Sequence, residues 1–127
     1  MSRFLLVCAG GAVGTGVRYL TGVLAVHWLG AGFPYGTLMV NLAGAFLIGL
    51  VQQLAAGLIP EPTRLFLVVG VLGGMTTYSA FTYETVRLMM LAEWGKVWTN
   101  VVVTTGLCLV LCWLGMAVGR IVTGPTS

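Results

Sequence analysis

Four long apolar runs follow one another along the chain, at about residues 4–29, 36–59, 64–91 and 96–122. Each reaches the roughly 20 apolar residues that a helix needs to cross the hydrocarbon core of a bilayer. A helix is also the one single-segment structure that satisfies its own backbone hydrogen bonds in lipid. The pattern therefore predicts an all-α integral membrane protein, with four transmembrane helices in a single domain covering residues 1–127.

Charge is too scarce for a soluble fold. Only 7% of the residues are charged and 58% are hydrophobic, whereas soluble domains carry about 25% charged residues. The six Lys and Arg residues are scattered singly and form no basic stripe of the kind that binds nucleic acid. We therefore expect a lipid bilayer as the surroundings and no nucleic acid as a partner.

The first run contains four glycines between residues 10 and 16. They lie within apolar sequence rather than between a strand and a helix, which excludes a dinucleotide-binding loop. Small residues four positions apart, such as Gly10 and Gly14, are typical of closely packed membrane helices. The run is too long for a signal peptide, although Arg3 ahead of it would suit one.

The centre of the third run is a poor helix former. Gly73 and Gly74 are followed by the β-branched Thr76 and Thr77, and this combination disfavours a continuous helix. A break at mid-membrane frees backbone carbonyls, which is tolerated where they line a cavity or meet an ion. We predict such a break in the middle of the third helix, and a simple packing notch with a kink is the alternative.

Polar residues recur every four positions in the fourth run, at Asn100, Thr104 and Cys108. They share one helical face, which is unfavourable against lipid. The face either lines a pore or bonds to neighbouring helices, and the spacing leaves both open. Cys8, Cys108 and Cys112 lie in apolar sequence and indicate buried thiols, since two thiols on one helical face make only a weak metal site.

The positive charges do not favour one orientation in the membrane. With four spans, both termini lie on the same side. Three basic residues fall on or near the side of the termini, namely Arg3, Arg64 and Arg120. Three others fall toward the opposite side, namely Arg18, Arg87 and Lys96. The positive-inside rule then has no preference. A chain without a charge bias can insert into the membrane in either orientation. Two copies of opposite orientation can then pair about a two-fold axis.

Neutral hydrogen-bond donors are spread through the runs. An anion crossing lipid needs donors in place of water, and neutral donors stabilise it without trapping it. The candidates are amides, hydroxyls and the positive edges of aromatic rings, namely Asn41, Asn100, Thr37, Thr76, Thr77, Ser79, Thr104, Tyr78 and Phe81. Core packing is the alternative for the aromatic residues. Glu84 either pairs with Arg87, three residues on, or has a functional role.

Three stretches resemble motifs of the fluoride channel family known as Fluc or CrcB. Residues 73–81, followed by Glu84, resemble its third-helix signature. Residues 36–42 look like its second-helix motif, and residues 10–14, followed by Arg18, look like its first-helix motif. The resemblance covers essentially the whole chain in order and spacing, with a weaker match in the fourth helix.

The resemblance implies a fluoride-selective channel that gives passive efflux of fluoride across the cell inner membrane and lowers cytoplasmic fluoride toxicity. It implies an antiparallel, dual-topology homodimer with a structural sodium ion held by backbone carbonyls of Gly73 and Thr76 from both copies. The resemblance and the donors above together lead us to assign a fluoride pathway to Asn41, Tyr78, Ser79, Phe81, Asn100 and Thr104. We assign Arg18 and Thr37 to a vestibule.

Two positions depart from the family pattern. Tyr78 stands where the family usually has Phe, so the ring edge is kept and a hydroxyl is added that could donate or obstruct. We expect transport to survive this change. Asn100 stands where a tyrosine or another polar residue occurs.

The main alternative is a small four-helix proton-coupled multidrug exporter, which relies on a carboxylate in the middle of its first helix. The first run here has no acid, and its only charge is Arg18. A non-transporting assembly protein would leave the clustered donors without a purpose. An enzyme is not expected, because the sequence has no evident nucleophile–base pair or metal cluster, and His27 lies near a loop.

Overall fold

The structure is a computed structural model that describes residues 2–124. All elements of this part are helical: α1 (Ser2–Leu29), α2 (Tyr35–Ala55), α3 (Glu61–Arg64), η1 (Leu65–Leu72), α4 (Gly73–Met75), α5 (Tyr78–Met90) and α6 (Trp94–Thr123). Four helical stretches are long and apolar enough to cross a membrane, namely α1, α2, the stretch Glu61–Met90 and α6. The prediction of an all-α protein with four membrane-spanning helices is confirmed.

The largest difference from the predicted runs is at the end of the second span. α2 ends at Ala55, whereas the apolar run continues to about residue 59. The chain turns here, as the Ala56 N–H bonds to the carbonyl of Gln53. Pro60 follows, and a proline disfavours helical backbone at the residue before it. Apolar composition therefore extends beyond the helix into the connection.

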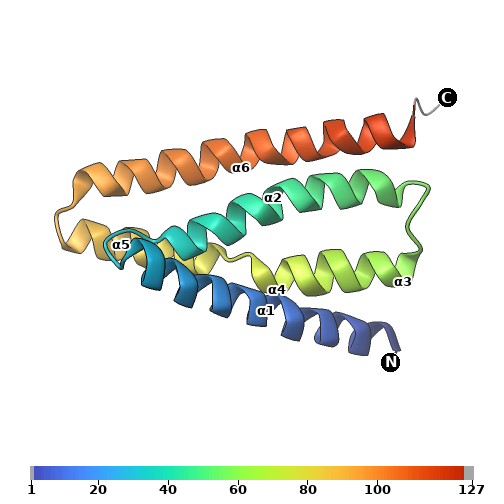
Figure 1. Cartoon of the computed structure of the whole chain (residues 1–127), viewed down its shortest axis with the longest axis horizontal. Helices are drawn as coiled ribbons and strands as arrows, with labels where there is room; N and C mark the ends of the chain where they lie inside the picture. The colour runs from blue at the N-terminus through green and yellow to red at the C-terminus, as the bar shows by residue number, and fades with distance from the viewer. Residues whose placement is uncertain (1, 125–127) are drawn as a thin grey trace.

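The four spans form two closely packed pairs. Figure 1 shows α6 beside α2 over most of its length and α1 beside η1 and α4, with both termini at one end of the molecule. α1 also contacts α2, and α5 contacts α6. This arrangement places the third span opposite the α2–α6 pair.

Glycines bring both pairs into backbone contact. A Cβ added at Gly14 of α1 would overlap the carbonyl oxygen of Val71, and Gly10 lies equally close to the third span. In the other pair, a Cβ at Gly49 of α2 would overlap the carbonyl oxygen of Cys112. Membrane helices pack by such close fit because lipid supplies no hydrophobic force between them.

The third span is the irregular one. η1 is a π-helix of 8 residues, a conformation that is rare and often marks functional sites. After α4, Thr76 and Thr77 have extended backbone, with ψ angles of 155° and 120°. Thr77 then caps α5, because its side-chain oxygen accepts a hydrogen bond from the Ala80 N–H.

The buried core is small and the apolar surface is large. Val40, Leu72 and Met75 form the buried cluster, whereas Trp28 is 78% exposed and Leu109 is 69% exposed. Soluble monomers rarely expose contiguous apolar surface on this scale. The exposed side chains suit contact with lipid, as expected of a multi-pass membrane protein.

Candidate functional site

A groove of about 550 Å³ lies between the third span and the α2–α6 pair, and we call it the central groove. No charged residue of the described chain lines it. Its lining combines apolar side chains with most of the polar and aromatic residues singled out from the sequence, namely Asn41, Thr76, Thr77, Tyr78, Phe81 and Thr104. Gly73, Cys108 and Cys112 line it as well. The groove therefore offers neutral donors without a fixed charge.

Asn41 holds the extended segment of the third span in place. Its Nδ2 donates to the carbonyl of Thr77 at 3.0 Å, and its Oδ1 accepts from the N–H of Thr77 at 2.8 Å. Both backbone groups are thus satisfied although the helix is interrupted. The amide has two hydrogens, so one remains for another acceptor.

Four backbone carbonyls, those of residues 73–76, lose their helical donors at this point, and the predicted sodium ligands Gly73 and Thr76 are two of them. In a continuous α-helix, the carbonyl of Gly73 would accept from the N–H of Thr77, and that of Thr76 from the N–H of Ala80. Here the Thr77 N–H donates to Asn41, and the Ala80 N–H donates to the Thr77 side chain at 3.2 Å. The carbonyls of Gly73 and Thr76 are therefore free to accept from, or coordinate, another group.

Gly73 and Gly74 are neighbours with different surroundings. A Cβ at Gly74 would lie 2.6 Å from the carbonyl oxygen of Gly11, so α1 requires a glycine there. A Cβ at Gly73 would meet only the carbonyl oxygen of Val68, at 3.7 Å, which is ordinary contact. No neighbour in the described chain therefore explains a glycine at position 73, which is exposed on the groove.

The aromatic pair lies at the start of α5. The ring centroids of Tyr78 and Phe81 are 5.7 Å apart and the rings are tilted by 44°. Tyr78 is 80% exposed, so core packing within the chain does not account for it. Ring edges carry partial positive charge, and both residues line the central groove.

The polar face of α6 serves two purposes. Asn100 is 1% exposed and faces α5, where its Nδ2 donates to the Thr85 hydroxyl at 3.0 Å. Its Oδ1 accepts from the Thr104 hydroxyl at 3.3 Å. Thr104 and Cys108, further along the same face, line the central groove. On this polar face, Asn100 thus bonds to a neighbouring helix, whereas Thr104 and Cys108 face the central groove.

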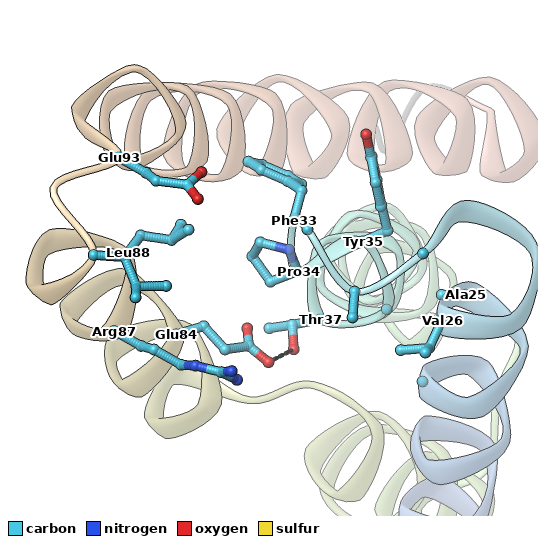
Figure 2. A pocket seen from close by; sticks show the side chains of 16 residues that line it. Ala25, Val26, Phe33, Pro34, Tyr35, Thr37, Glu84, Arg87, Leu88 and Glu93 are labelled. Carbon is cyan, nitrogen blue, oxygen red and sulfur yellow. Dashed lines mark hydrogen bonds between the residues drawn. The ribbon is translucent and has the colours of Figure 1, made fainter.

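A smaller cavity of about 280 Å³ lies between the ends of α1 and α5 and the start of α2, and we call it the end pocket. Figure 2 shows Thr37, Glu84 and Arg87 around it. The Thr37 hydroxyl donates to Oε1 of Glu84 at 2.8 Å, whereas Oε2 is buried without a hydrogen-bond partner. Among the described residues, no ion pair joins Glu84 and Arg87.

The remaining site residues lie outside the two cavities. Arg18 is half-buried on α1, and Ser79 is exposed next to the extended segment, with its hydroxyl 3.2 Å from that of Thr77. Arg18 and Thr37, predicted together as a vestibule, are thus not brought into one cavity, since only Thr37 lines the end pocket.

Sequence reasoning missed the bonds that organise the site. Asn41 was singled out as a donor, but not as the partner of Thr77. The bond between Thr85 and Asn100 joins two helices and has no local signal. The cap at Thr77 could have been found, because a threonine directly before a helical stretch is a common N-cap.

The comparisons with known proteins cover nearly the whole chain. A family model described as "CrcB-like protein, Camphor Resistance (CrcB)" matches residues 5–116. A protein of Thermus thermophilus named "Fluoride-specific ion channel FluC" is 46% identical over 125 residues, 98% of this chain and 100% of the relative. Proteins of the same name are 43% identical in Geobacter metallireducens, over 94% of this chain and 98% of the relative, and 41% identical in Anaeromyxobacter sp., over 98% and 100%.

Proposed function

This chain belongs to the CrcB family, and on that premise we propose that it is a fluoride-specific ion channel through which fluoride leaves the cell passively. It is a channel rather than an enzyme, and it resides in a membrane through four helices. Efflux of this kind lowers fluoride toxicity in the cytoplasm. The inner membrane is the location that fits this role.

The fluoride pathway runs along the central groove. Fluoride is small and strongly hydrated, so several close donors have to replace its water, and neutral ones let it leave again. The spare amide hydrogen of Asn41 and the ring edges of Tyr78 and Phe81 provide them. The Thr104 hydroxyl has a single hydrogen, donated to Oδ1 of Asn100 at 3.3 Å, so it serves fluoride by turning that hydrogen from Asn100 to the anion. Asn100 acts indirectly, because it accepts from the Thr104 hydroxyl and so orients it.

Three further polar residues take supporting positions. Ser79 lies beside the extended segment at the start of the aromatic pair. Thr37 and Arg18 serve the approach of the anion, Thr37 from the end pocket and Arg18 from α1. Oε1 of Glu84 accepts a hydrogen bond from the Thr37 hydroxyl and so fixes its position.

We further propose an antiparallel, dual-topology homodimer with a structural sodium ion between the copies. The observation that supports this is the set of freed carbonyls of residues 73–76, which includes those of Gly73 and Thr76, since hard cations prefer oxygen ligands. Gly73 supports it too, because its own chain does not require a glycine there. The same carbonyls of a second, inverted copy would complete the ligand set. The even split of basic residues agrees with insertion in both orientations.

The channel function is tested with purified protein in liposomes that hold a fluoride gradient. A fluoride electrode should record passive release without a requirement for protons, while chloride stays trapped. Proton-dependent exchange of organic cations without fluoride release would contradict the proposal.

The proposed sodium site is tested by Gly73→Val, which should abolish dimer assembly and fluoride efflux. The matched control is Gly95→Val, because a Cβ at Gly95 meets nothing within 4 Å and that position lies outside the central groove. Normal efflux from Gly73→Val would argue against a central ion.

A further inference from the structure

Two of the three cysteines lie on the lining of the central groove. Cys108 and Cys112 are one turn apart on α6, both are half-buried, and both line the groove. Cys8, by contrast, is exposed on α1 and lines neither cavity. The paired thiols therefore open into one space that is accessible from outside the chain.

We propose that Cys108 and Cys112 form a binding site for soft, two-coordinate metal cations, represented by Hg²⁺. Side chains four residues apart on a helix have Cβ atoms about 5–6 Å from each other. If each bond has about the length of a zinc–sulfur bond, 2.3 Å, the two sulfurs of a linear unit lie about 4.6 Å apart. Cysteine side chains with that Cβ spacing can bring their sulfurs to this separation. Thiolates are the ligands that select soft metals.

The groove favours this ligand set over others. Zinc normally takes four ligands, and no group of three or more His, Cys, Asp or Glu residues lies together in the described chain. A cation that prefers two-coordinate binding to sulfur does not need four ligands. When Hg²⁺ binds, each thiol releases one proton and two sulfur–mercury bonds form, so the bound unit is neutral. A neutral complex suits a groove without charged residues, where an unpaired charge is expensive.

The backbone of α6 is held firmly at this site. The carbonyl of Cys112 packs directly on Gly49 of α2, and Gly115, one turn further, packs on the carbonyl of Phe46. The two thiols therefore keep their spacing without rearrangement of the helix, which lowers the entropic cost of chelation.

A bound cation inhibits the channel, and this consequence rests on the proposed function. Cys108 is one turn along α6 from Thr104, which lines the same groove as Tyr78 and Phe81. Mercury bound between the thiols occupies the groove beside these donors and narrows the pathway.

Binding is tested first and without reference to transport. Purified protein in detergent is titrated with Hg²⁺ nitrate, and the sulfur-to-mercury absorption band is followed. The Cys8→Ser variant should bind one Hg²⁺ per chain. Cys108→Ser and Cys112→Ser, each made in the Cys8→Ser background, should lower the affinity by at least about tenfold. Unchanged affinity in either variant would reduce the site to a single reactive thiol and overturn the proposal. One Hg²⁺ for every two chains would also overturn it, because it would place the bridge between copies.

Inhibition is then measured as fluoride efflux from liposomes, with each variant compared with its own untreated rate. Hg²⁺ should block the natural protein and Cys8→Ser, whereas Cys108→Ser and Cys112→Ser should retain most of their efflux. Equal block of all four proteins would overturn the inhibitory role. Absence of efflux before any Hg²⁺ is added would contradict the channel function instead, and the binding titration would still decide the metal site.

Discussion

The two halves of the third span are held by different means. The first half, η1 and α4, lies against α1 through glycines such as Gly14 and Gly74, whose added Cβ atoms would meet backbone atoms. The second half, α5, is positioned by side-chain hydrogen bonds, from Asn41 at its start and from Asn100 further along. One half is fixed by steric fit and the other by directional polar contacts.

This difference explains where the site lies. In the first half, the backbone groups of η1 bond within the helix. Side-chain bonds instead take over partners that a continuous helix would use, which frees the carbonyls of Gly73 and Thr76. The free groups and the groove therefore occur at the junction, where steric fit ends and hydrogen bonding begins.

The largest effect is expected from Gly14→Val, which tests the sterically fixed half. The added side chain would overlap the carbonyl of Val71, and overpacking of a fitted interface costs about 1–3 kcal/mol or more. The thermal unfolding temperature in detergent should fall sharply. Gly16→Val is the control, because Gly16 has no neighbour within 4 Å of its Cβ position. Equal losses in both variants would show that packing on α1 does not hold this half.

Asn41→Leu should rank second and tests the junction. It leaves the N–H of Thr77 without a partner, at about 1–3 kcal/mol. The Thr77 carbonyl loses one of its two bonds and still accepts from the first turn of α5. Stability and fluoride efflux should fall together. Met39→Leu, at an exposed position of the same helix, should change neither. Full stability of Asn41→Leu would mean that the extended segment is held by something other than Asn41.

Asn100→Leu tests the polar half and should have a smaller effect. Hydrogen bonds between membrane helices contribute about 0.6 kcal/mol on average. Asn100 makes one such bond, to Thr85 of α5, and a second bond to Thr104 within α6. A double-mutant cycle with Thr85→Val measures the coupling directly. If the losses of stability from the two substitutions are strictly additive, this hydrogen bond does not help to hold α5 against α6.

The smallest effect is expected from Arg87→Gln, which lies in the polar half but makes no ion pair within the described residues. The unfolding temperature should stay within the range of ordinary surface substitutions, about 0.5 kcal/mol. A loss above about 1 kcal/mol would exceed the range of exposed ion pairs and would indicate that Arg87 and Glu84 interact strongly.

The four spans were predictable because lipid leaves so few alternatives to an apolar helix. The site was predictable in its residue types but not in its contacts. Gly73 and Gly74 look alike in the sequence, yet only Gly74 packs against α1, which depends on where Gly11 lies. Asn41 could be recognised as a donor, whereas its bonds to Thr77 join residues of different helices and become apparent only once the helices are placed.

The close pairing of α2 with α6 has a consequence for biogenesis. A ribosome delivers α2 early and α6 last, and the glycine surface of α2 around Gly49 stays unmatched until the final helix arrives. During synthesis the first three spans therefore remain in the translocon or the lipid without their complete set of helix contacts. A chain that stops before residue 94 lacks the partner of α2 altogether, so quality-control proteases that recognise unpaired membrane helices would find an open target in it.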